Sequence, residues 1–128
     1  MRQQNVRQQN DSIKEDIRRR ASYWRTAALP SALEEVATAQ GIDCKKAVFL
    51  RLEVDFPGMP RLFGTLLTSN ERFIEFEIET DETHSKVESV EAWRDVTDAQ
   101  NLSAHNRGIG VGTGALAIQV LREINRDA

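Results

Sequence analysis

The spacing of apolar residues predicts two helices at the start of the chain. In the first, apolar residues recur every three or four positions and would share one helical face: Ile13, Ile17, Ala21, Trp24 and Ala28. Pro30 should end this helix, because a proline disfavours the α conformation in the residue before it. Two Ser-x-x-Glu sequences, Ser12 to Glu15 and Ser31 to Glu34, are typical of helix starts, and Gly41 should end the second helix.

From residue 46 the apolar positions alternate, which predicts strands with one face on a core. The expected strands cover residues 46–56, 61–68, 72–79 and 86–96, with Gly64 as a candidate bulge and an irregular, bulged fourth strand. The connections between them are short, so consecutive strands should pair antiparallel in a meander.

The last periodic segment predicts a helix over residues 115–125, after a glycine-rich stretch at 108–114. The predicted fold is therefore α+β, with two N-terminal helices, a four-stranded antiparallel meander and a C-terminal helix packed on the sheet. We expect the helices on one face of the sheet. Residues 1–10 are polar and are expected to form a flexible tail, so that residues 11–128 make a single domain.

Composition is ordinary for a globular protein and restricts the location. The chain has 128 residues, 40% hydrophobic and 29% charged. No apolar run is long enough to cross a membrane, and the first residues lack the apolar core of a secretory signal. Cys44 is the single cysteine and cannot form an internal disulfide. A cytoplasmic location is expected.

The charges are distributed unevenly around a net charge of −3. The first quarter is basic and the middle is acidic. Alternation with Ile74, Phe76 and Ile78 places three glutamates of the third strand on its solvent face. An acidic face speeds association with a basic partner, and a tryptophan beside it would be a typical interface anchor, although Trp93 could instead pack in the core. The candidate partner-binding residues are Glu75, Glu77, Glu79, Glu91, Trp93 and Asp95.

The glycine-rich stretch invites a phosphate-binding interpretation. Its spacing does not match a dinucleotide fingerprint, and no lysine follows it as in a P-loop. It resembles the acetyl-CoA pyrophosphate loop of the GNAT acetyltransferases. That resemblance implies an alternative function, an acyl-CoA-binding N-acetyltransferase-like protein with cofactor contacts at Arg107, Gly108, Gly110, Gly112 and Thr113. Members of that family place two helices between their first two strands, whereas here both precede the first strand, so we favour a conformational role for the glycines.

Other site chemistry is sparse. His84, His105 and Cys44 lie in separate segments without metal-ligand spacing, so neither a metal nor another cofactor is expected, and no catalytic set is apparent. The run Arg18, Arg19 and Arg20 makes nucleic-acid binding a second alternative, but it lacks the interleaved aromatic residues that stack on bases. The usual role of such a run is a solvated helix face.

In size, acidity and lack of a catalytic set, the chain resembles the small immunity proteins of bacterial toxin–immunity systems. The resemblance implies a non-enzymatic protein-binding module that neutralises a basic toxin domain. It rests on architecture and charge, so no residue roles are carried over. The oligomeric state is left open.

Overall fold

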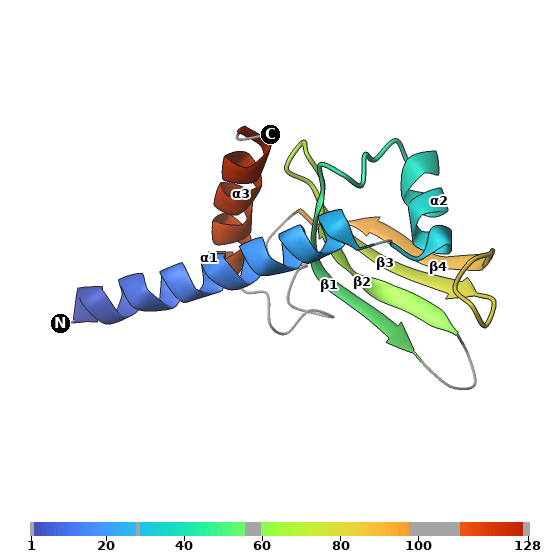
Figure 1. Cartoon of the computed structure of the whole chain (residues 1–128), viewed down its shortest axis with the longest axis horizontal. Coiled ribbons are helices and arrows are strands. Elements are labelled where there is room, and N and C mark those ends of the chain that lie inside the picture. The colour runs from blue at the N-terminus through green and yellow to red at the C-terminus, as the bar shows by residue number, and fades with distance from the viewer. Residues whose placement is uncertain (1, 28, 56–59, 98–110, 127–128) are drawn as a thin grey trace.

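The computed structural model describes residues 2–27, 29–55, 60–97 and 111–126, and it confirms the α+β class (Figure 1). The described residues form three helices and one four-stranded antiparallel sheet. Their order along the chain is α1 (Arg2–Thr26), α2 (Ser31–Ala39), β1 (Val48–Asp55), β2 (Arg61–Leu67), β3 (Phe73–Thr80), β4 (Val87–Asp95) and α3 (Val111–Arg126). No helix in these ranges is both long and apolar enough to span a bilayer.

The sheet is the predicted meander, in the order β1-β2-β3-β4. Its bulges lie in the two edge strands. Leu50 is the extra residue in β1, while Glu88 and Glu91 are the extra residues in β4. The irregularity predicted for β4 is thus confirmed. A bulge at Gly64 is not, since Gly64 pairs regularly with Leu52 and Phe76.

Gly64 has a different role, because the β1 backbone passes very close to it. A Cβ atom at this position would lie 1.9 Å from the carbonyl oxygen of Arg51. Real side chains never approach a carbonyl so closely, so the strand contact requires a residue without a Cβ.

The helices cover both faces of the sheet, which corrects the expectation of one covered face. Val48 and Leu67 pack with α1 and α3, whereas their chain neighbours Phe49 and Leu66 pack with α2. Successive side chains of a strand point to opposite faces, so the two helical layers lie on opposite sides. We call the α1 and α3 side face A and the α2 side face B.

Both helix starts differ from the predicted ones. α1 begins at Arg2 and so includes most of the segment expected to be a tail, with Ser12 inside the helix. Glutamine and arginine are good helix formers, and extending an existing helix is easier than starting one. Ser31 is the first residue of α2, after Pro30, and no side chain caps this end.

The predicted end of α2 is confirmed. Gly41 has a φ of 77°, and the Gly41 and Ile42 amides donate to the carbonyls of Thr38 and Ala37. This is the hydrogen-bond pattern by which a glycine terminates a helix.

α1 crosses β1 and packs against α3, while its N-terminal turns extend away from the sheet (Figure 1). Polar contacts fix this arrangement. The Glu123 carboxylate accepts from Arg18 and from Lys14, the latter at 3.1 Å, and Arg20 donates to the Leu50 carbonyl at 2.6 Å. Arg19 lies 3.8 Å from Asp16. Two of the three arginines named for nucleic-acid binding, Arg18 and Arg20, are therefore engaged within the fold, whereas Arg19 stays mostly exposed.

Candidate functional site

Face A changes from apolar to polar along the strands. Under α1 and α3 it carries the apolar residues Val48, Leu50, Leu67 and Phe73. Beyond them, residues paired across the sheet form three polar rows, which we call the polar platform. The first row is Arg51, Thr65, Glu75 and Arg94; the second is Glu53, Phe63, Glu77 and Ala92; the third includes Arg61, Glu79 and Ser89.

An ion pair and a cation–ring contact link the platform strands. Arg61 donates to Glu77 at 2.7 Å, between β2 and β3. On β1, Arg51 donates to Glu53 at 2.7 Å and places its guanidinium 5.5 Å from the centre of the Phe63 ring. The platform therefore carries positively and negatively charged side chains in contact with one another, whereas the sequence suggested a purely acidic face.

The first row contains two buried polar groups. Glu75 is only 5% exposed and Thr65 is fully buried, so the prediction that Glu75 faces solvent is wrong. Its row adjoins the apolar residues of face A that pack under α1 and α3. Glu75 Oε1 and Thr65 Oγ1 have no hydrogen-bond partner among the described residues. An unsatisfied buried polar group typically costs about 1–3 kcal/mol, and more if it is charged.

Unpaired carboxylates gather at the opposite end of the platform. Among the described residues, Glu79, Glu88 and Glu91 make no ion pair. The Ser89 hydroxyl donates to Glu91 at 2.8 Å, and Ser89 is the cross-strand partner of Glu79. Ser89 and Glu91 are two residues apart on one strand, so the Glu91 carboxylate lies on the same face as Glu79. We call Glu79 and Glu91 the acidic end.

Trp93 does not belong to the platform. It pairs with Phe76 across the strands and packs in the core of face B, with the two ring centroids 6.0 Å apart. The core-packing interpretation of Trp93 is thus the better description, and its half-buried ring lies on the opposite side of the sheet from Glu77.

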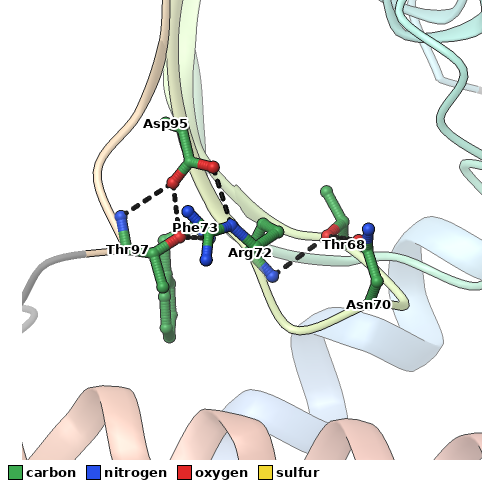
Figure 2. A network of polar contacts seen from close by, with 6 residues as sticks. All are labelled: Thr68, Asn70, Arg72, Phe73, Asp95 and Thr97. Atoms are coloured by element: carbon green, nitrogen blue, oxygen red, sulfur yellow. Dashed lines mark hydrogen bonds and ion pairs between the residues drawn. The ribbon is translucent and has the colours of Figure 1, made fainter.

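Asp95 fixes the end of β4 to the turn between β2 and β3 (Figure 2). Its carboxylate accepts from Arg72 Nε at 2.7 Å and from the Thr97 amide at 3.0 Å. Thr97 Oγ1 in turn accepts from the Phe73 amide at 3.1 Å, and Thr68 Oγ1 accepts from the Arg72 amide at 3.1 Å. Partial burial raises the pKa of Asp95, but the hydrogen bonds from Thr97 and Arg72 outweigh it and lower the pKa overall.

The residues of the acetyl-CoA alternative are only partly within the described ranges. Arg107, Gly108 and Gly110 lie outside them. Gly112 and Thr113 are in the first turn of α3, which begins at Val111 rather than at residue 115. Both α1 and α2 precede β1, as the sequence predicted, and this order differs from that of the acetyltransferase family.

Metal and thiol chemistry find little support in the described part of the chain. No group of three or more histidine, cysteine, aspartate or glutamate side chains there could hold a metal ion. Burial raises the pKa of the Cys44 thiol, as do the nearby carboxylates of Glu34 and Asp43, which disfavours the reactive thiolate.

Sequence reasoning missed the residues of β2 and β4 that complete the platform, namely Arg61, Phe63, Thr65 and Arg94. Alternation alone places the first three on one face of β2. Alternation does not give the strand register, which places Thr65 opposite Glu75 and Glu75 opposite Arg94. No protein-family model, curated protein or solved structure matches the chain. The site is therefore interpreted from its own geometry.

Proposed function

We propose that the chain is a protein-binding module that engages a basic segment of its partner through the polar platform. The observation that carries this proposal is the acidic end, where Glu79 and Glu91 converge from adjacent strands and make no ion pair among the described residues. Unpaired carboxylates on one surface attract cations and steer a basic partner toward it.

The rest of the platform suits a protein partner. Paired charges such as Arg61 and Glu77 can exchange contacts with a charged surface and set the register of binding. The half-buried Phe63 ring adds apolar area among them. Interfaces of this kind combine an aromatic contact with a polar surround.

A more specific form of the proposal is an immunity protein that neutralises a basic toxin domain. It is supported by the acidic end and by the overall charge of −3. Its test is protection in cells that express a toxin domain encoded beside this chain. Co-expression of the chain should restore growth, and the Glu79→Lys/Glu91→Lys variant should not. Equal protection by that variant, with both proteins present at equal levels, would contradict the role of the acidic end.

The direct test of the module is calorimetric titration of the full chain with octalysine. Binding should weaken as salt rises from about 50 mM to about 300 mM, because salt screens exposed charges. The Glu79→Gln/Glu91→Gln variant should bind about 5-fold more weakly, since exposed charge pairs each contribute up to about 1 kcal/mol.

A charge-matched control makes this test specific. Glu34 and Glu35 are exposed on α2, which covers face B. The Glu34→Gln/Glu35→Gln variant neutralises as many carboxylates and should bind almost as the wild type does. An equal loss in both variants would show that only the net charge matters, and the platform proposal would fail.

A further inference from the structure

The first row of the platform holds two polar atoms that the fold leaves unsatisfied. Thr65 and Glu75 are direct cross-strand partners, so their Cβ atoms lie about 5 Å apart on face A. Both side chains are more than nine-tenths buried, and Thr65 Oγ1 and Glu75 Oε1 find no hydrogen-bond partner in the described ranges. Unsatisfied buried groups are uncommon in native proteins and call for a specific explanation.

The cation next to Glu75 holds it only loosely. Arg94 Nη2 lies 3.6 Å from Glu75 Oε2, whereas Arg61 and Glu77 are 2.7 Å apart in the adjoining rows. Charge-assisted hydrogen bonds are usually about 2.7–2.9 Å long. The Arg94 side chain is 59% exposed, against 6% for Glu75. Arg94 can therefore move into solvent at little cost to packing, and Glu75 retains capacity for a closer cation.

We propose that Thr65 and Glu75 form a subsite for one lysine or arginine side chain of the basic partner segment. This inference rests on the proposed function and names the anchoring contact within it. The incoming cation replaces Arg94 as the counterion of Glu75 and donates to Glu75 and to Thr65 Oγ1. An ammonium or guanidinium group has enough donors for both acceptors. No bond is made or broken, so the contact is a reversible exchange of counterions.

Removing the acceptors Glu75 or Thr65 and removing the competing cation Arg94 should have opposite effects on binding affinity. Octalysine and octaarginine serve as probes of the full chain, which also distinguishes the two kinds of cation. Glu75→Gln should weaken binding about 10-fold, and Thr65→Val, which keeps the side-chain shape, about 3-fold. Arg94→Gln removes the competing cation and should strengthen binding about 3-fold.

Matched variants separate this subsite from general electrostatics. Glu77→Gln neutralises a carboxylate on the same strand and face, and Glu77 is more exposed than Glu75. Simple charge attraction predicts that Glu77→Gln weakens binding at least as much as Glu75→Gln, and that result would overturn the subsite. Arg72→Gln removes an exposed arginine at the end of the sheet and should leave affinity unchanged.

Stability supplies an independent readout. A hydroxyl that serves only binding should be dispensable for folding, so Thr65→Val should keep or raise the unfolding midpoint while it weakens binding. Unchanged binding by Thr65→Val and Arg94→Gln would overturn the inference, even if Glu75→Gln fails to fold. If the wild type binds neither probe, the proposed function fails as well. If it binds and only the Glu79→Gln/Glu91→Gln variant is impaired, the subsite alone fails.

Discussion

The two halves of face A differ in chemistry although the same four strands form both. In one half, Leu67 and Phe73 are buried under α1 and α3. In the other, Arg61, Glu77 and Glu79 are half-exposed, and Arg61 forms an ion pair with Glu77 across the strands. Alternation along β2 and β3 is equally regular in both halves.

The face of the sheet on which a residue lies and the presence of a helix over that residue are therefore separate properties. Glu75 and Glu79 share a strand and a face, yet Glu75 adjoins the helix-covered half and is buried whereas Glu79 is not. Two carboxylates that look equivalent in the sequence therefore have different energetics. The buried one costs stability unless it is satisfied, and the exposed one costs little.

The largest expected loss of stability is found when the removal of one aromatic ring is compared between the two halves. Phe73→Ala should lower the free energy of unfolding by about 3–5 kcal/mol, because it leaves a cavity in the covered half. Phe63→Ala, in the platform, should cost no more than about 1 kcal/mol, since its ring is half-exposed. Urea denaturation measures both. Equal losses would mean that the two halves are equally important for the core.

A smaller loss of stability should follow from a substitution that displaces the strands, which run through both halves. Gly64→Ala places a Cβ against the Arg51 carbonyl and should cost about 2 kcal/mol, because β1 must move away. Gly41→Ala is the control: it strains a positive φ at the end of α2 but leaves the sheet unaltered. A thermal midpoint for Gly64→Ala equal to that of the wild type would contradict the close strand contact.

The smallest expected loss of stability involves the ion pairs between α1 and α3 over the covered half. Hydrogen bonds from Arg18 and Lys14 lower the pKa of Glu123 below its ordinary value of 4.5. A lowered pKa means that the stabilisation is present above the ordinary pKa and is lost as pH falls through the lowered one. Because water screens these partly exposed groups, the contribution should stay below about 1 kcal/mol.

Glu123→Gln provides the measurement. The variant should be slightly less stable than the wild type at neutral pH, and the difference should shrink as the solution is acidified below the ordinary pKa. Its effect on binding at the platform should be nil. A stability difference that grows toward acid pH would show that the sign of the pKa shift is wrong.

The sequence predicted the strands well, because periodicity and short connections determine a meander locally. It also predicted the end of α2, where Gly41 adopts the required positive φ. It could not predict that α2 lies on face B, since this depends on how the segment between residues 40 and 47 directs the chain. The burial of Glu75 was missed because burial depends on what packs against that part of the face, which no local pattern encodes.

The candidate site was predicted only in part. Glu77, Glu79 and Glu91 do share a face, but the bulge at Glu91 places Trp93 and Asp95 on the other face. Trp93 and Asp95 make contacts within the fold that the sequence did not predict: Trp93 packs against Phe76, and Asp95 binds Arg72 and Thr97. Alternation gives the face of Thr65, but only the register places its hydroxyl beside a carboxylate.

The most direct test of the platform is to map where a basic segment contacts the protein. Amide chemical shifts of the isotope-labelled full chain should be followed by NMR during titration with octalysine. The proposal predicts that the largest shifts occur at Glu79, Ser89 and Glu91, with little change at Glu34 and Glu35 on α2. Shifts centred on α2, or spread evenly over all exposed acidic residues, would contradict it.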